Sequence, residues 1–278
     1  MLPNLIIIGA RKAGTSSLYN YLGQHPEITV SRQKELRFFI ARDNWSRGLD
    51  WYEAQFGDAS TPICAEASPQ YTTYPRNRGI PERMHSVVPD AKLIYLVRDP
   101  IERLLSHYMT ELAEGRESRE LEEALLPPSA SPYVAESSYR MQLEPFLAHY
   151  PLDRVLVLQQ EALLNERWAT IRRAFSFLGV DPAFDSPRFD SIHNPSSRVR
   201  RLDAPSWLPG RVKPQGTSRI PWRVRARAKR ILYAPFLRKV ERPVLDEGLR
   251  EQLVSHLQPD ADGFRELTGL ELPEWSTS

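Results

Sequence analysis

A glycine-containing turn near the start of the chain combines residue types that bind phosphate groups in other proteins. Four apolar residues, Leu5-Ile6-Ile7-Ile8, are followed by Gly9-Ala10-Arg11-Lys12-Ala13-Gly14 and then by Thr15-Ser16-Ser17. The apolar run is typical of a strand buried on both faces of a parallel sheet, and the residues after it favour a tight turn that opens a helix. Because the first N–H groups of a helix have no carbonyl partners, this turn is predicted to bind an anion.

The position of the cation separates this turn from the common ATP- and GTP-binding loop. That loop carries lysine directly before a serine or threonine, whereas here Thr15 stands at the lysine position and Lys12 lies three residues earlier. Lys12 is therefore expected to project from the turn itself, toward a 5′-phosphate and the group that is transferred from it. The alternative is that Arg11 and Lys12 are solvent-exposed turn residues, since short glycine motifs are weak evidence.

A second segment has the pattern of another phosphate site. Residues 92–97 form an apolar run that predicts a buried strand, and Arg98-Asp99-Pro100 ends it because proline lacks the N–H that a central strand needs. Apolar residues from Ile101 to Leu112 then recur at helical spacing. Arg98 can bind two phosphate oxygens with its guanidinium group, and Ser106 adds a neutral donor. Two anion sites at the ends of parallel strands indicate a nucleoside ligand with phosphates at both ends.

At these segments the chain resembles the sulfotransferases that use 3′-phosphoadenosine 5′-phosphosulfate (PAPS), most closely the branch of the heparan sulfate and bacterial sulfotransferase-domain enzymes. The resemblance extends over residues 4–200 and includes His25-Pro26, Lys34-Glu35 before Phe38-Phe39, and Glu66-Ala67-Ser68-Pro69. It implies that PAPS is the co-substrate and adenosine 3′,5′-bisphosphate (PAP) the product. The residues expected to bind this nucleotide are Arg11, Lys12, Ala13, Gly14, Thr15, Ser16, Ser17, Arg98 and Ser106.

The resemblance also implies a mechanism of in-line sulfuryl transfer. Lys12 and the nearby N–H groups would stabilise the charge that develops on the departing phosphate. Glu35 is implied as the general base, and Glu66 is the other candidate. Lys34 would either keep Glu35 ionised or contact the donor, and the alternative is that the two form an exposed charged pair. Contacts with the acceptor are expected from Lys34, Glu66, Ser68 and Tyr71.

One departure from the family pattern concerns the acceptor. The related enzymes usually have lysine after the glutamate of the Glu-Lys-Ser/Thr-Pro motif, and this chain has Ala67 there. The missing cation argues against simply carrying over a polyanionic glycan, so the expected acceptor is a hydroxyl or amine of a small molecule, a lipid-linked compound or a carbohydrate. The sequence shows no carboxylate cluster or magnesium motif, and we expect no metal.

Length and composition limit the number of domains and the classes of partner that we expect. The chain has 278 residues without a Gly/Ser-rich linker or a repeat, which predicts one domain over residues 1–278. We expect a single-domain, P-loop-like α/β fold with three layers, in which helices flank a central, mainly parallel sheet. With 37 basic and 35 acidic residues the net charge is +2, so nucleic acid is not an expected partner. One cysteine, Cys64, and no apolar run of membrane-spanning length favour a soluble cytoplasmic protein.

The positive charge is concentrated in residues 198–242, which contain 14 Arg or Lys. Arg198 and Arg200 are candidates for contact with the 3′-phosphate. Residues 222–240 have the pattern of a basic amphipathic helix, which would contact a membrane, form a wall of the acceptor cleft, or pack as an ordinary surface helix. The sequence leaves the oligomeric state open.

Two other functions remain open at this stage. One is a P-loop nucleotide kinase, which the lysine before Gly14 and the lack of a magnesium carboxylate disfavour. The other is a non-catalytic binding protein with the PAPS-binding fold, which would keep the donor contacts without turnover.

Overall fold

A five-stranded parallel sheet forms the centre of the computed structural model, which describes residues 1–57, 60–190, 200–202, 237–239 and 242–278. The order of the strands is β2-β3-β1-β4-β5. Their bounds are β1 Leu5–Gly9, β2 Ile28–Val30, β3 Ile63–Ala67, β4 Lys92–Val97 and β5 Val155–Gln159. The strands predicted at 5–8 and 92–97 are confirmed, and so is the parallel sheet.

Strand β1 lies at the point where the chain changes direction across the sheet. It pairs with β3 on one side, Leu5 opposite Ala65, and with β4 on the other, Leu5 opposite Lys92. All five residues of β1 are buried, as its apolar run predicts. In open α/β sheets a crevice forms outside the carboxyl ends of the strands at such a reversal, and ligands bind there. The turn after β1 therefore occupies the expected ligand-binding edge.

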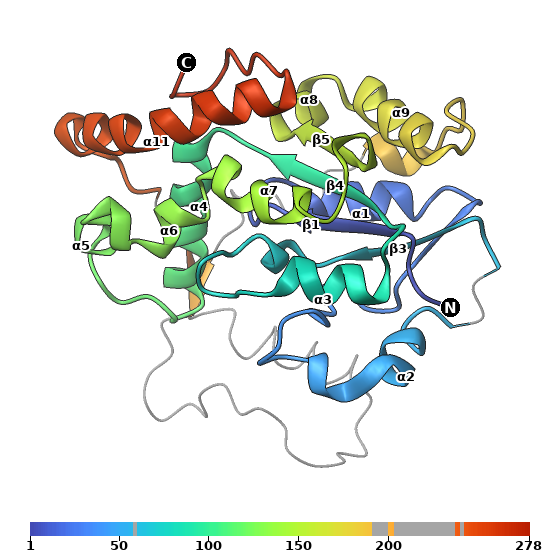
Figure 1. Ribbon diagram of the computed structural model, residues 1–278. Coiled ribbons are helices and arrows are strands. Elements are labelled where there is room, and N and C mark those ends of the chain that lie inside the picture. Colours follow the sequence, from blue (N-terminus) through green and yellow to red (C-terminus); the bar gives the residue numbers. More distant parts are fainter. Residues whose placement is uncertain (58–59, 191–199, 203–236, 240–241) are drawn as a thin grey trace.

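Helices cover both faces of the sheet and give the predicted three layers (Figure 1). Helices α1 and α9 contact each other on one face, while α3 and α7 lie over the opposite face and α11 packs against α7. The bounds of these helices are α1 Thr15–Leu22, α3 Ile80–Val87, α7 Tyr139–Leu147, α9 Arg167–Leu178 and α11 Glu247–Thr268.

The remaining elements are shorter, except for α4. They are α2 Gly48–Glu53, α4 Pro100–Ala113, α5 Leu121–Leu125, α6 Pro132–Ala135, α8 Gln160–Asn165 and the antiparallel pair β6 Arg200–Leu202 and β7 Leu237–Lys239. Single 3₁₀ turns span Trp45–Arg47, Pro69–Tyr71, Pro128–Ala130, Leu152–Arg154 and Pro187–Asp190.

Helix α4 is fixed at both its start and its apolar face. The Asp99 side chain accepts a hydrogen bond from the Glu102 N–H at 2.8 Å, and Pro100 occupies the first turn, so the helix begins where the sequence predicts. Its apolar side packs with α5, α6 and α11 in a second core that includes Leu104, Leu125 and Leu253. This packing holds α4 rigidly beside the carboxyl end of β4.

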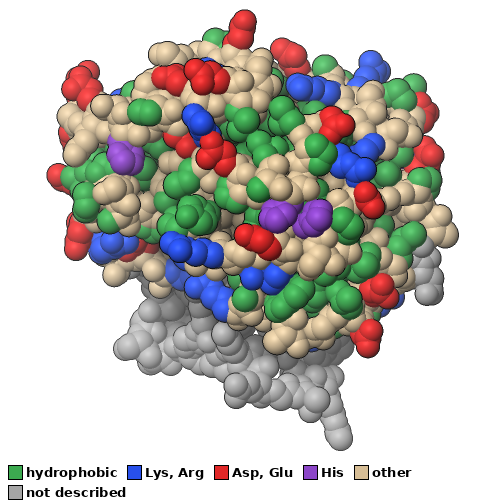
Figure 2. Space-filling model, viewed as in Figure 1, with side chains coloured by type: hydrophobic (Ala, Val, Ile, Leu, Met, Phe, Trp, Pro, Cys, Tyr) green, Lys and Arg blue, Asp and Glu red, His purple; other side chains and the backbone are tan. Residues whose placement is uncertain are grey.

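The next features are the distribution of charge on the surface and the basic segment at residues 198–242. In the face shown in Figure 2, acidic and basic side chains are interspersed with apolar ones, in keeping with the near-neutral charge. Among the residues that the structure describes, none of the helices has the length and apolar character needed to cross a membrane. The predicted contacts of Arg198, the side chain of Arg200 and residues 222–236 of the predicted helix lie outside what the structure describes. At its C-terminal end the helix prediction is wrong, because Leu237–Lys239 form strand β7, which pairs with β6.

Candidate active site

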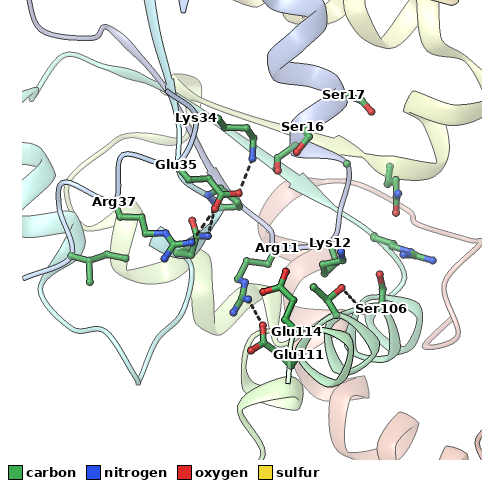
Figure 3. Close-up of a pocket in the computed structure, with 18 of the residues that line it drawn as sticks. Arg11, Lys12, Ser16, Ser17, Lys34, Glu35, Arg37, Ser106, Glu111 and Glu114 are labelled. Carbon is green, nitrogen blue, oxygen red and sulfur yellow. Dashed lines mark hydrogen bonds and ion pairs between the residues drawn. The ribbon is translucent and has the colours of Figure 1, made fainter. Parts of the chain in front are cut away.

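A cavity of about 840 Å³ opens at the carboxyl edge of the sheet. It is lined from three directions: by the turn after β1 and the start of α1, by the loop after β2, and by α4 (Figure 3). The predicted site residues among its lining are Arg11, Lys12, Gly14, Thr15, Ser16, Ser17, Lys34, Glu35, Arg98 and Ser106. The fold thus brings both predicted anion-binding segments and the predicted base to one cavity.

The turn after β1 needs both of its glycines. A Cβ on Gly9 would lie 2.1 Å from the Oγ1 of Thr72 and 2.8 Å from the Tyr95 ring, so these two side chains leave no room for another. Gly14 has a φ of 93°, a left-handed conformation that glycine adopts without steric cost. The helix then begins at Thr15, and the first amides of α1 face the cavity end. Ala13 is fully buried behind the turn and does not line the cavity.

Lys12 is the cation of this turn that keeps its charge available. Within the described ranges it forms no hydrogen bond or ion pair, although it is half-buried in the cavity wall. Burial and the positive charge of Arg11 lower the pKa of Lys12 below its ordinary value. Its backbone also adopts a left-handed conformation, with a φ of 71°. The charges of Glu114 and Glu111 oppose this shift without direct contact, so the desolvated ammonium group can still bind an anion.

Arg11 is held differently from its neighbour. Its guanidinium group lies 2.8 Å from an oxygen of Glu111 on α4 and 3.7 Å from one of Glu136. The same Glu136 is buried and also pairs with Arg76 at 2.7 Å. Arg11 therefore lines the cavity while its charge is already compensated, and it ties the turn after β1 to α4.

Arg98, which follows β4, and Ser106, in α4, line the same cavity as the turn after β1. The carbonyl oxygen of Arg98 accepts a hydrogen bond from the Tyr139 hydroxyl at 2.7 Å, which fixes the backbone at the end of β4. The Arg98 guanidinium lies 3.0 Å from Glu102, one turn into α4. Ser106 follows on the same helix and is buried at the cavity wall. This pair therefore presents a guanidinium group and a hydroxyl group at the cavity that Lys12 also lines.

Glu35 extends into the cavity from the loop after β2 and is surrounded by donors (Figure 3). Lys34 lies 3.0 Å from one carboxylate oxygen, and Arg37 at 3.1 Å and Gln70 at 2.6 Å contact the other. Burial alone would raise the pKa of Glu35, but the charge of Lys34 and these hydrogen bonds outweigh it and lower the pKa to about 2. Glu35 is therefore ionised at neutral pH, and Lys34 supplies its main compensating charge.

The structure corrects the expected location of three further residues. Glu66, Ser68 and Tyr71 do not line the cavity but are buried beneath the Glu35 loop. Both Ser68 and Tyr71 donate hydrogen bonds of 2.6 Å to Glu66. Glu66 has no exposed surface, and burial raises its pKa above the ordinary value despite these bonds. The position of Glu66 beneath the loop removes it as a direct proton acceptor from substrate.

Several cavity residues are absent from the sequence-based expectations. They include Arg37, Arg42, Gln70, Arg76, Thr110, Glu111, Glu114, Arg116 and Gln160. Arg37 and Gln70 lie within two residues of the predicted Glu35 and Tyr71, so closeness in sequence is a signal for these two. No group of three or more potential metal ligands occurs in the described part of the chain.

Comparisons with known proteins agree with this geometry. The family model described as "Sulfotransferase domain" matches residues 2–198. Heparan sulfate glucosamine 3-O-sulfotransferase 5 of Mus musculus is 30% identical over 194 residues, covering 65% of this chain and 54% of the relative. The bifunctional heparan sulfate N-deacetylase/N-sulfotransferase of Drosophila melanogaster is 25% identical over 212 residues, covering 66% of this chain and 20% of the relative. The chain thus spans about half the length, or less, of these curated relatives.

A solved structure matches nearly the whole chain. The sulfotransferase from Alicyclobacillus acidocaldarius superimposes with a TM-score of 0.71 and 25% identity, covering 99% of each chain. The family model alone accounts for well over half of the residues, and the turn after β1 and the Arg98 segment both fall within it. The chain belongs to the sulfotransferase family of enzymes.

Proposed function

We propose that this protein transfers a sulfuryl group from PAPS to a hydroxyl or amine of an acceptor. The observation that carries the proposal is that one cavity combines Lys12, a cation without a direct ion pair among the described residues, with an ionised carboxylate, Glu35. Arg98 and Ser106 at the same cavity provide the second anion site that PAPS requires. ATP lacks a 3′-phosphate and would leave that second site unused.

In the proposed reaction the acceptor oxygen or nitrogen attacks sulfur, and the bond between sulfur and the bridging oxygen of the 5′-phosphate breaks. The leaving phosphate retains the electron pair and gains negative charge. Lys12 and the backbone N–H groups of Gly14, Thr15 and Ser16 stabilise that charge. The acceptor proton passes to the carboxylate of Glu35, and PAP leaves as product. The reaction as written requires no metal, since protein groups supply the positive charge.

Glu35 needs a change in its surroundings to act as an effective base. A carboxylate with a pKa of about 2 is ionised but accepts protons weakly. The sulfuryl oxygens of PAPS compete with Glu35 for Lys34, whose Nζ lies 3.0 Å from the carboxylate. When Lys34 turns to the donor, Glu35 loses its strongest compensating charge and its pKa rises. Donor binding thereby prepares the base for the acceptor.

The charges at the cavity opening bear on the acceptor. Arg37, Arg76 and Arg116 each pair with a carboxylate, at 3.1, 2.7 and 2.6 Å respectively. Compensated arginines provide little net attraction for a densely charged polyanion. The relatives' names state heparan sulfate as their substrate, and we extend to this chain the wider class of a small-molecule, lipid-linked or carbohydrate acceptor with few negative charges.

The domain organisation and the cellular location belong to the same proposal. A single domain over residues 1–278 is supported by helix α11 near the C-terminus, which packs on α7 against the one central sheet. A cytoplasmic location is supported by the single cysteine, Cys64, which is buried and unpaired as in proteins of reducing compartments.

The proposal is tested with ³⁵S-labelled PAPS and extracts of the protein's own host. Transfer of label to a product, abolished by excess unlabelled PAP, is the expected result. Phosphate transfer from Mg·ATP in a parallel assay would instead identify a kinase. Tight PAP binding without transfer to a broad panel of hydroxyl and amine acceptors would identify a binding protein.

A further inference from the structure

A buried carboxylate lies beneath the loop that carries Glu35, outside the reach of substrate. Glu66 is fully buried at the end of β3, and three hydroxyl groups donate hydrogen bonds to it. Tyr52 binds one carboxylate oxygen, and Ser68 and Tyr71, both at 2.6 Å, bind the other. An ionised carboxylate is costly to bury unless such donors replace its water. The cluster is thus built around the charge of Glu66.

The same hydroxyl groups continue to the backbone of the base loop. The Ser68 oxygen accepts a hydrogen bond from the N–H of Arg37 at 2.9 Å, and the Tyr71 oxygen accepts one from the N–H of Phe39 at 3.4 Å. The N–H of Glu35 itself donates to the carbonyl of Ala67 at 2.9 Å. The N–H groups of residues 35, 37 and 39 are therefore bound to the last residue of β3 and to the segment that follows it.

This anchoring matters because the loop has an unfavourable backbone conformation. Glu35 and Arg37 have φ angles of 65° and 51°, in the left-handed region that residues with a side chain rarely adopt. Without the anchors the loop would relax to an ordinary conformation and turn both side chains. The Arg37 guanidinium lies 3.1 Å from the Glu35 carboxylate, so its displacement would change both the position and the charge of the base.

We infer that Glu66 is a positioning residue for the proposed general base, acting through Ser68 and Tyr71 to hold the left-handed Glu35–Arg37 turn against the cavity. This inference rests on the proposed function, because it assigns a purpose to the geometry of Glu35. Glu66 touches neither the donor site nor the cavity. It acts by orienting the hydroxyl groups, since each hydroxyl that donates to Glu66 has its oxygen lone pairs left to accept from the loop.

The test removes the Ser68 hydroxyl, which joins Glu66 to the Arg37 N–H, and leaves Glu66 and Glu35 unchanged. In Ser68→Ala, Glu66 keeps the Tyr52 and Tyr71 donors, while the N–H of Arg37 loses its acceptor. We expect kcat to fall at least tenfold, since small displacements of a reacting group have large effects. The dissociation constant for PAP, measured by calorimetry, should stay within about twofold of the wild type, since Ser68 lies outside the donor site. Ser131→Ala is the matched control. Ser131 is also buried, its hydroxyl donates a hydrogen bond of 2.9 Å to the Ala124 carbonyl, and it does not line the cavity.

The pH dependence of kcat/KM separates positioning from a loss of stability. In the wild type, Glu35 stays ionised well below pH 4, so its protonation does not lower kcat/KM in the accessible range. In Ser68→Ala, displacement of the loop weakens the contacts with Lys34, Gln70 and Arg37 that lower the pKa of Glu35. This pKa then rises toward its ordinary value, and kcat/KM should begin to fall at a higher pH than in the wild type. The Ser131→Ala control should show the wild-type profile.

The possible results separate the inference from the function on which it rests. Wild-type kcat and an unchanged pH profile in Ser68→Ala would overturn the inference, whereas an inactive wild type that binds PAP would overturn the proposed function. If Ser68→Ala fails to fold, Tyr71→Phe keeps the ring volume and removes the acceptor of the Phe39 N–H together with one donor to Glu66. The same split of reduced kcat and retained PAP affinity is expected there, and its absence would refute the role of Glu66.

Discussion

Replacement of Lys12 by alanine tests the electrostatic part of the mechanism. The ammonium group of Lys12 forms no direct hydrogen bond or ion pair in the described ranges, although the charges of Glu114 and Glu111 act on it, so its removal should change the melting temperature little. A unit charge about 4 Å from the leaving phosphate, at an effective dielectric constant of about 20, contributes about 4 kcal/mol. That energy corresponds to roughly a thousandfold in rate.

The assay is single-turnover transfer of label from ³⁵S-PAPS, with PAP affinity measured separately by calorimetry. We expect kcat to fall by roughly 10²- to 10³-fold, the range found when one preorganised charge-stabilising donor is removed. PAP affinity should fall much less, because Arg98 and Ser106 hold the other phosphate. Lys12→Arg keeps the charge in the same left-handed turn and should recover part of the rate. A loss of less than tenfold in Lys12→Ala would refute the assignment of Lys12 to the leaving group.

Three other substitutions have distinct expected outcomes. Glu35→Gln should keep PAP affinity and lose rate in the same single-turnover assay; an unchanged rate would place the base elsewhere. Because the pKa of Glu35 is lowered to about 2, its ionic contacts stabilise the fold above pH about 4.5 and are lost as the pH falls toward 2, so thermal melts of Glu35→Gln should lack this acid-dependent component. Arg98→Ala should weaken PAP binding by roughly 10- to 100-fold and leave AMP binding unchanged, and equal losses for both ligands would remove Arg98 from the 3′-phosphate site. Gly9→Ala should lower the free energy of unfolding by about 1–3 kcal/mol in urea titrations, since its Cβ would lie 2.1 Å from Thr72; wild-type stability would show that the turn has room to move.

The local patterns of the sequence predict the parts of the site that depend on neighbouring residues. The apolar run of β1, the glycines after it and the proline at the start of α4 each have one favoured local structure, and all three are confirmed. Parallel strands then place the carboxyl end of β1 beside that of β4, which brings Lys12 and Arg98 to one cavity.

The parts of the site that the sequence does not predict depend on contacts between residues distant in sequence. The pairing of Arg11 with Glu111 joins positions 100 residues apart, and no local pattern distinguishes Arg11 from Lys12 beforehand. The burial of Glu66 depends on Tyr52 and Tyr71 closing over it, so its sequence motif reads equally well as a substrate contact. The left-handed turn at Glu35 likewise arises from tertiary hydrogen bonds, since no glycine marks it.

The claim that one cavity binds both phosphates of an adenosine bisphosphate is tested most directly by calorimetry with PAP, using ATP and AMP as competitors and no added metal. The account predicts one PAP site per chain, loss of affinity in Arg98→Ala, and no displacement of PAP by an equal concentration of ATP. Failure to bind PAP, or displacement of PAP by ATP, would contradict it.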